Sequence, residues 1–289
     1  MTPAIDAVIL TRNEAVNLPR CLDSLQGLCR KIFVVDSGST DRTTEVAQAH
    51  GAEIIVHPFE THAKQWNWAL KNLPLDAEWT LALDADQRVT PALREEILRR
   101  LPETPAEVTG WYLPRKQIFR GKWIRFGGYW PKYLLKLFRR GGARTDEREL
   151  VDFRFYPAGQ TACFTQPLIE ENLKERRITF WLQKHVRFAE LHAREEALRR
   201  SGRGGWSLQP AWRGTPDQRT LWLKDRIWFR FPLLARPFCY FPFRMILQLG
   251  ILDGPTGWLY HFLHGFWYEW MIALRVLELL RQPRRDRRC

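Results

Sequence analysis

Three stretches decide the fold: VILTRNEAVNLPRCLDSL at residues 8–25, IFVVDSGSTDRT at residues 32–43 and LALDADQRVTP at residues 81–91. Each opens with a short apolar run that suits a buried strand and then becomes polar. In the first stretch, Leu18, Cys21, Leu22 and Leu25 recur at helical spacing, so they form one apolar helical face. Strands and helices that alternate with short links predict an α/β fold, in which a mostly parallel sheet carries helices on both faces.

The expected elements follow from the same periodicity. We expect strands over residues 5–10, 31–35, 53–56 and 79–83. A helix should follow each strand: the first capped by Asn17, the second from about Asp41 to Gly51, the third over residues 62–72 and the fourth opening at Thr90–Pro91. Dense Gly, Pro, Trp and Arg predict irregular structure over residues 111–160. A long helix is expected over residues 174–200, followed by a linker over residues 201–220.

Polar residues follow three of the predicted strands. They are Thr11 to Glu14 after the first strand, Asp36 to Asp41 after the second, and Asp84-Ala85-Asp86 after the fourth. Ligands of open α/β sheets bind outside the carboxyl ends of the strands, so these loops should line one crevice. Two Asp residues with one residue between them suit a hard divalent cation that bridges to phosphate oxygens. For Asp41 alone, a turn-forming or helix-capping role is the better interpretation.

Together, the three stretches resemble the family 2 glycosyltransferases of GT-A fold. The sequence is most similar to the bacterial members that build lipopolysaccharide core and related surface glycans, over about the first 160 residues. The resemblance implies a Rossmann-like nucleotide-diphospho-sugar transferase fold, a nucleotide-sugar donor and a divalent cofactor, Mg²⁺ or Mn²⁺.

The resemblance also implies roles for five residues at the strand ends. Thr11 would line the nucleobase pocket, with Glu14 beside it, and Asp36 would accept a hydrogen bond from the base. Asp84 would bind the ribose or a metal-bound water, and Asp86 would ligate the metal at the diphosphate.

Four further positions bear on the donor. Gln65 and Asn67 stand where the family often has a basic or amide pair near the donor. Arg12 departs from the family, which usually has an aromatic there to stack on the base, although a guanidinium can also stack. Gln87 replaces an acidic residue that is common directly after the Asp pair.

The acceptor hydroxyl needs a carboxylate base within hydrogen-bonding reach. The run DERELVD at residues 146–152 offers four carboxylates, and the resemblance implies an acidic residue in this stretch. Asp152 is our first choice and Glu149 the second, with Glu147 as the reserve. The competing interpretation is a solvated charged strip that pairs with neighbouring arginines.

The basic run that precedes these carboxylates has two interpretations. Lys132, Lys136, Arg139 and Arg140 could bind the donor diphosphate or an anionic acceptor, but each by itself is better read as a solvated surface charge. Trp130-Pro131 could shape the sugar pocket or pack in the core.

Charge divides the chain into three functional segments. The net charge is −5 over residues 1–110, +11 over residues 111–205 and +7 over residues 206–289. We assign them to the nucleotide-sugar-binding half of the transferase domain, its acceptor-binding half, and an amphipathic helical membrane-associating region. The last segment is rich in Trp, Phe and Arg without about 20 uninterrupted apolar residues, which suits helices at an anionic membrane surface. A buried helical subdomain or a dimer interface is the alternative.

Five scattered cysteines predict free thiols in a reducing compartment, and no secretory signal is visible. We therefore expect a peripheral or monotopic protein on the cytoplasmic face of the inner (plasma) membrane.

The predicted activity is an inverting transfer of a sugar from a nucleoside-diphosphate sugar, with UDP the first choice, to a lipid-linked glycan in lipopolysaccharide or surface-polysaccharide biosynthesis. The alternative within the fold is transfer to polyprenyl phosphate. The alternative from another class is a metal-dependent nucleotidyltransferase, which would normally need a phosphate-gripping loop that TRNEA does not provide. No GxGxxG follows the first strand, which disfavours a dinucleotide enzyme. No nucleic-acid partner is expected, because a basic nucleic-acid-binding module does not explain the acidic first third.

Overall fold

The computed structural model describes residues 4–151, 153–202 and 208–281. The chain forms two compact units. The first unit comprises Met1–Trp123, Tyr129–Arg148 and Phe153–Arg176. The second unit comprises Ile124–Gly128, Glu149–Asp152 and Arg177–Cys289. This division follows packing and not function, so the three functional segments stay a prediction.

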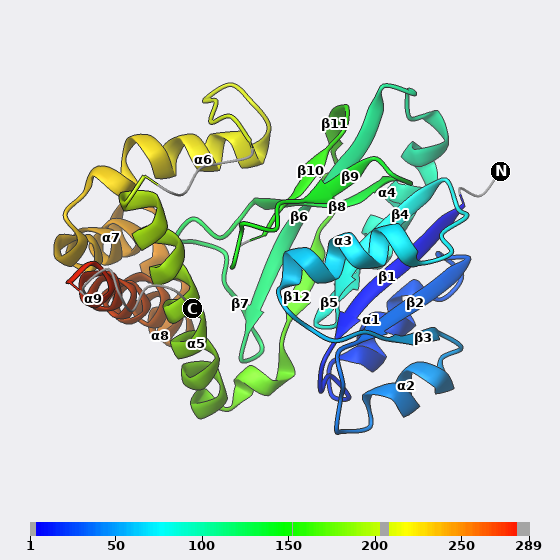
Figure 1. Cartoon of the computed structure of the whole chain (residues 1–289), viewed down its shortest axis with the longest axis horizontal. Coiled ribbons are helices and arrows are strands. Elements are labelled where there is room, and N and C mark those ends of the chain that lie inside the picture. Colours follow the sequence, from blue (N-terminus) through cyan, green and yellow to red (C-terminus); the bar gives the residue numbers. More distant parts are fainter. Residues whose placement is uncertain (1–3, 152, 203–207, 282–289) are drawn as a thin grey trace. The chain divides into compact units, whose positions relative to one another are not determined.

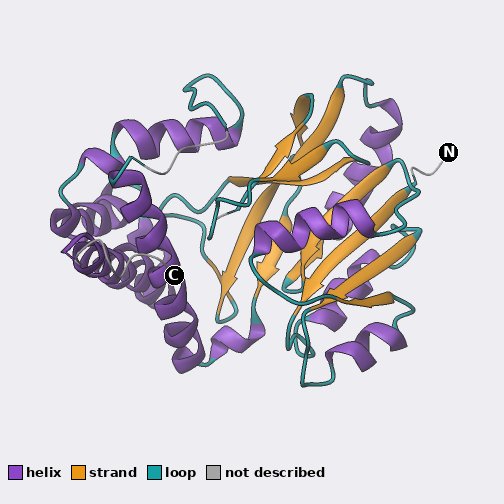
Figure 2. Cartoon of the chain, viewed as in Figure 1, coloured by secondary structure: helices purple, strands orange, loops and turns teal. Residues whose placement is uncertain are grey.

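The first unit is built around one large mixed sheet (Figures 1 and 2). Its strands are β1 (Ile5–Thr11), β2 (Lys31–Asp36), β3 (Glu53–Val56), β4 (Trp79–Asp84), β5 (Gln87–Val89), β6 (Val108–Phe119), β7 (Lys122–Trp123), β8 (Lys132–Arg139), β11 (Gln160–Cys163) and β12 (Leu168–Glu171). The sheet order is β3-β2-β1-β4-β8-β6-β12-β5, with β7 and β11 also paired to β6. Strands β1 to β4 are parallel to one another, whereas β8 is antiparallel to both of its neighbours. A separate two-stranded ladder joins β9 (Ala143–Thr145) to β10 (Phe155–Pro157).

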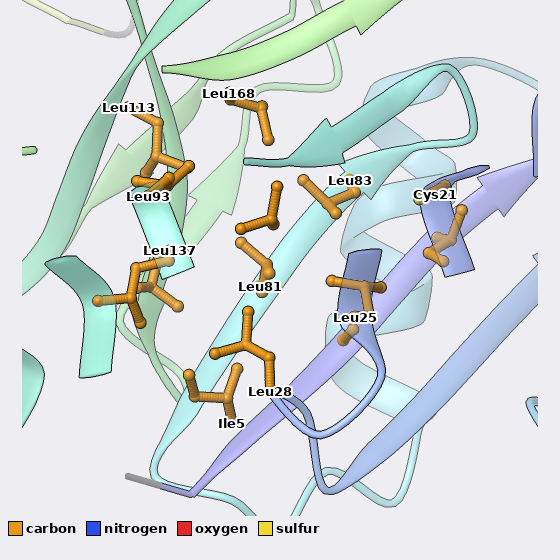
Figure 3. Packing of buried hydrophobic residues seen from close by; sticks show 14 of the residues in the cluster. Ile5, Cys21, Leu25, Leu28, Leu81, Leu83, Leu93, Leu113, Leu137 and Leu168 are labelled. Carbon is orange, nitrogen blue, oxygen red and sulfur yellow. The ribbon is translucent and has the colours of Figure 1, made fainter. Parts of the chain in front are cut away.

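Helices cover both faces of this sheet, as the sequence predicts. They are α1 (Leu18–Leu25), α2 (Thr43–Ala49), α3 (His62–Asn72) and α4 (Pro91–Arg100). The apolar face of α1 is fully buried, and Figure 3 shows Cys21 and Leu25 in one cluster with Leu81 and Leu83 of β4. Alternate residues of β1 enter two different clusters, since Ile9 packs with α1 while Val8 packs with Trp66 of α3.

Three residues were expected at the ends of helices. Thr90 caps α4 as predicted, because its Oγ1 accepts a hydrogen bond from the Leu93 amide at 3.1 Å. Gly51 follows α2 with a φ of +73°, the left-handed conformation expected after a helix. The prediction for Asn17 is wrong: its side chain makes no cap bond and instead contacts Glu14 and Asn172.

The prediction of irregular structure over residues 111–160 is also wrong. Strands β6 and β8 fill much of this range, and β6 lies inside the sheet between β8 and β12. Pro114 argued against a strand, because proline cannot donate to a ladder, yet it pairs in register with Tyr133. A register shift between Trp111 and Tyr112 further breaks the alternation that a sequence pattern would reveal.

The second unit is helical. Its helices are α5 (Ile178–Arg200), α6 (Pro216–Arg226), α7 (Arg236–Pro242), α8 (Gly254–Phe262) and α9 (Tyr268–Arg281), with π-helical turns at Phe243–Leu247 and Leu263–Trp267. The core packs α5 on α9 through Ala189, Ala193, Ile272 and Val276. Over the described ranges, no helix has both the length and the apolar character needed to cross a bilayer.

Two predicted boundaries change in this part of the chain. The long helix begins at Ile178, and residues 173–176 form a separate 3₁₀ turn that belongs to the first unit. The predicted linker over residues 201–220 is too long, because Thr215 and Gln218 form a capping box that opens α6 at Pro216. Cys21, Cys29, Cys163 and Cys239 are free thiols, as predicted, and Cys289 lies outside the described residues.

Candidate active site

The polar loops gather at one edge of the sheet because their strands are adjacent and parallel. Thr11, the last residue of β1, pairs in register with Asp36 at the end of β2. On the other side of β1, Leu10 pairs with Asp84 at the end of β4. The strand ends that carry these loops are therefore adjacent, as expected, and a single crevice lined by all three loops stays a prediction.

Asp36 organises the loop that follows β2. It is buried, and its Oδ2 accepts hydrogen bonds from the amides of Gly38 at 3.0 Å and Ser39 at 2.8 Å. Its Oδ1 accepts from the hydroxyls of Thr11 at 3.0 Å and Ser39 at 2.5 Å. Four donors from the chain itself thus hold this carboxylate. Its predicted bond to a nucleobase stays a prediction, and the carboxylate would have to share or exchange one of these donors.

The loops after β1 and β2 are also tied to each other. Asn13 donates its amide to Ser39 Oγ at 2.8 Å, and its side-chain oxygen accepts from the Thr40 amide at 2.7 Å. Asp41 Oδ1 accepts from the amide of Thr43 at 3.0 Å, which is the turn-forming role predicted for it. The two loops therefore form one cross-linked rim.

Gln65 and Asn67 of α3 support loops in this structure. Gln65 is buried, and its Nε2 donates to Ser37 Oγ at 3.1 Å while its Oε1 lies 2.8 Å from His57 Nδ1. Asn67 Oδ1 accepts from the Thr145 amide at 2.9 Å. Donor contacts by these two amides stay a prediction, whereas Gln65 braces the rim at Ser37 and Asn67 holds the end of β9 at Thr145.

The position of Lys136 beside the Asp pair was not predicted from the sequence. It was expected at the surface, but it is only 4% exposed, and its Nζ donates to Asp84 Oδ2 at 2.8 Å. The same ammonium lies 5.9 Å from the ring centre of Trp66 and 6.0 Å from that of Phe155. Asp84 supplies the counter-charge that a buried ammonium requires. A lone lysine within the apolar strand YLLKLF was the signal for this role.

Gln87 holds the turn that carries the Asp pair. Its Oε1 accepts from the Asp84 amide at 3.1 Å, and its Nε2 donates to Glu170 Oε2 at 2.8 Å. Glu170 Oε1 in turn accepts from Arg115 at 3.0 Å. Gln87 stands where the family often has an acidic residue, and here the carboxylate of Glu170 is hydrogen-bonded to Gln87. Glu170 and Arg115 were missed because no local pattern marks them.

Asp86 is partly exposed beside a shallow surface hollow. Two arginines border this hollow, and both pair with Glu171, Arg20 at 2.9 Å and Arg88 at 3.1 Å. Among the described residues, no group of three His, Cys, Asp or Glu side chains is placed to hold a metal ion. A cation at Asp86 would therefore take other ligands from substrate and water.

The remaining residues of the first loop differ in exposure. Arg12 is exposed, whereas Glu14 is partly buried and accepts from Lys174 Nζ at 2.5 Å and Asn17 Nδ2 at 2.7 Å. Trp130 packs edge-on against Trp123, with ring centres 5.6 Å apart. Roles for Arg12 and Glu14 beside the base, and for Trp130 at a sugar, stay predictions.

The candidate bases occupy different environments. Asp146 is buried and bound by Arg148, which fits the interpretation of local ion pairing for this residue. Glu147 is exposed and accepts from Asn67 Nδ2 at 3.2 Å, and Glu149 is buried. Asp152, the first choice, lies outside the described residues.

Comparison with known proteins identifies the family. The profile described as Glycosyl transferase family 2 matches residues 6–159. The chain belongs to this family. A relative from Rhizobium meliloti (strain 1021), the lipopolysaccharide core biosynthesis glycosyltransferase LpsC, is 32% identical over 192 residues, which cover 60% of this chain and 68% of LpsC. An uncharacterized glycosyltransferase from Rickettsia bellii is 35% identical over 100 residues, about a third of each chain.

Among solved structures, glucosyl-3-phosphoglycerate synthase from Mycobacterium tuberculosis, in complex with Mn²⁺, UDP and glucosyl-3-phosphoglycerate, is 23% identical. The match has a TM-score of 0.32 and covers 41% of this chain and 45% of the synthase. Membership in family 2 establishes the protein as a glycosyltransferase of GT-A fold. It therefore favours glycosyl transfer over the nucleotidyl transfer considered from the sequence.

Proposed function

We propose that the protein transfers a sugar, with inversion, from a nucleoside-diphosphate sugar to a lipid-linked glycan of the lipopolysaccharide core or a related surface glycan. The observation that carries the proposal is the juxtaposition of the Asp36 loop and the Lys136–Asp84 pair on the two sides of β1. The name of the Rhizobium relative supports the class of product.

The nucleotide would lie along the rim formed by the loops after β1 and β2. Thr11 and Asp36 offer the hydroxyl and carboxylate that bind a base, and the exposed guanidinium of Arg12 offers a flat surface for stacking. UDP is the proposed nucleotide. Hydrogen bonds between the two loops already hold them in place. Less conformational entropy would therefore be lost when the nucleotide binds.

Asp86 would hold Mg²⁺ or Mn²⁺ together with the diphosphate. The chemistry of the site fits such an ion, because Mg²⁺ is commonly held by one or two carboxylates and by substrate phosphates. When bound, the cation supplies positive charge to the departing diphosphate. Asp84 has its charge engaged by Lys136, and Asp86 is the proposed metal ligand of the pair.

The chain itself would supply the base for an inverting displacement. The acceptor oxygen attacks the anomeric carbon, the nucleoside diphosphate leaves from the opposite side, and a carboxylate of the 146–152 run takes the hydroxyl proton. Asp152 and then Glu149 are the proposed bases. Glu147 is the third candidate, and its hydrogen bond from Asn67 would orient it.

The second unit would bring the enzyme to its acceptor at the cytoplasmic face of the plasma membrane. Its sequence combines a net charge of +7 over residues 206–289 with many aromatic side chains. Basic residues near an anionic leaflet contribute about 1 kcal/mol each. The protein is proposed to be peripheral or monotopic there.

A donor screen tests the proposal. Full-length protein is incubated with UDP-, GDP- and dTDP-sugars and a lipooligosaccharide acceptor, and free nucleoside diphosphate is measured with and without Mn²⁺. Acceptor-dependent release of one nucleoside diphosphate supports the proposal. Transfer to polyprenyl phosphate in place of the glycan would move the assignment to the alternative acceptor, and release of pyrophosphate would contradict glycosyl transfer.

A further inference from the structure

The surface of the second unit between Phe231 and Phe262 is apolar. Large hydrophobic side chains that are at least 41% exposed recur through this segment, namely Phe231, Leu234, Phe238, Phe243, Ile246, Leu247, Leu249, Ile251, Leu252, Trp258 and Phe262. The greatest exposure occurs at the turn between α7 and α8, where Ile246 is 66% exposed, Leu247 74% and Leu252 60%. Single exposed hydrophobic residues are ordinary, but such a density of them within one segment is typical of an interaction surface.

The ionisable side chains of the same segment face the interior. Arg236, Arg244 and Asp253 are the only Arg, Lys, Asp or Glu residues between Phe231 and Phe262 in the sequence. They are 2%, 1% and 3% exposed, and His261 is fully buried. On a water-facing helical surface, by contrast, most charged side chains are exposed.

Each of these buried groups has an ionic or hydrogen-bonding partner inside the second unit. Arg236 donates to Glu196 of α5 at 2.8 Å. His261 lies between Arg244, 3.0 Å from its Nδ1, and Asp253, 2.9 Å from its Nε2. A neutral imidazole fits both contacts, since Nδ1 can accept from the guanidinium while Nε2–H donates to the carboxylate. Burial and the neighbouring Arg244 lower the pKa of His261, which keeps the ring neutral.

Charged groups that point inward and hydrophobic groups that point outward are the arrangement of a surface in contact with lipid. We propose that residues 231–262 form a monotopic docking face whose exposed side chains insert into the headgroup–acyl boundary of an anionic bilayer. This inference goes beyond the general membrane association proposed above, because it names the inserting surface. It also makes the burial of apolar side chains, and not charge attraction, the main source of membrane binding.

Charge at the edges of this face selects a bilayer over a second copy of the chain. Arg226 and Arg230 are exposed directly before it. Anionic headgroups complement such a cationic border. Two copies docked through the same face would instead bring their cationic borders together, where like charges repel.

Flotation of the full-length protein with vesicles tests this face. Phosphatidylcholine vesicles are compared with vesicles that also contain phosphatidylglycerol, at low and high salt. The test variant is Leu247→Glu combined with Leu252→Glu, because both side chains are exposed and the core should tolerate the change. Val56→Glu is the matched control, since Val56 is 70% exposed in β3 of the first unit. Thermal unfolding followed by circular dichroism confirms that each variant folds.

The wild-type protein and the Val56→Glu control should bind mixed vesicles and keep a substantial part of that binding at high salt. The double variant should bind at least about tenfold more weakly, because two apolar side chains are lost from the buried area. Equal binding by the double variant and the wild type would overturn the proposal, as would complete release of the wild type by salt.

Light scattering without vesicles tests whether a second copy of the chain, and not a bilayer, covers this face. A wild-type dimer that the double variant converts to a monomer, with no binding to either vesicle, would assign the face to a second copy. None of these measurements uses donor or acceptor, so their failure is distinguishable from failure of the proposed transfer reaction.

Discussion

The ammonium of Lys136 lies 2.8 Å from Oδ2 of Asp84, so the first carboxylate of the Asp pair has a built-in counter-ion. The second carboxylate, Asp86, is two residues away and borders the hollow with Arg20 and Arg88. The two aspartates therefore have different electrostatic environments, although the sequence presents them as equivalents. We therefore expect Asp84 to anchor the turn, and we propose Asp86 as the ligand of the cation.

The Lys136–Asp84 pair predicts a coupled loss of stability and activity. Lys136→Met keeps the length of the side chain but leaves Asp84 without its counter-charge. We expect a loss of about 1–3 kcal/mol in the free energy of unfolding, below the range for a fully buried pair because Asp84 is partly exposed. Turnover should fall about tenfold or more. Urea unfolding measures the stability, and Lys132→Met at an exposed position of β8 is the control.

A double-mutant cycle decides whether the pair acts as a unit. Adding Asp84→Asn to Lys136→Met removes the orphaned charge and should recover part of the lost stability. Strictly additive losses would show that the two side chains do not interact.

Asp86→Ala should abolish metal-supported turnover while the far-ultraviolet circular dichroism spectrum stays unchanged. Calorimetric titration of Mn²⁺ in the presence of UDP should show weakened binding, since one protein ligand is missing. Normal turnover of this variant, or full wild-type activity in excess EDTA, would remove the metal from the proposal.

The base is expected at Asp152. Asp152→Asn keeps the shape and removes the basicity, so turnover should fall about 10²-fold or more while donor binding persists. Parallel measurements on Glu149→Gln and Glu147→Gln rank the three candidates. A loss confined to Glu149→Gln would make Glu149 the base, and normal rates in all three would place the base outside this run.

Glu269 of α9 predicts a stability that depends on pH. Burial raises its pKa to about 7, with a further increase from Glu196 and opposing effects from Arg236, Lys224 and Arg244. Above the unfolded-state pKa of 4.5, the unfolded chain loses this proton before the folded chain does. The contribution of the neutral carboxyl to stability therefore declines as pH rises from about 4.5 to about 7.

Glu269→Gln removes this titration. The variant should match the wild type near pH 4.5 and exceed it by about 1–3 kcal/mol at pH 8, as measured by denaturant unfolding. A constant difference between the two proteins at every pH would exclude Glu269 as the source.

Periodicity predicted most of the first hundred residues because each element there carries a local signal. The helical spacing of Leu18 and Leu25, the cap at Thr90 and the glycine at position 51 each report on their own segment. Strand β6 was not predicted, because Pro114 and a register shift interrupt the alternating pattern that indicates a strand. Lys136 and Glu170 were missed because their partners, Asp84 and Gln87, are 52 and 83 positions away in the chain. Such pairings depend on sheet topology, which no local pattern contains.

The short segment Ile124–Gly128 has a consequence for the order of folding. It interrupts the strands of the first unit, yet the carboxylate of Asp253 accepts the amides of Arg125 and Phe126, and the Gln248 carbonyl accepts the amide of Gly127. These partners are synthesised more than a hundred residues after the segment itself. On the ribosome, these hydrogen bonds of the connection between β7 and β8 can therefore form only after most of the chain has emerged.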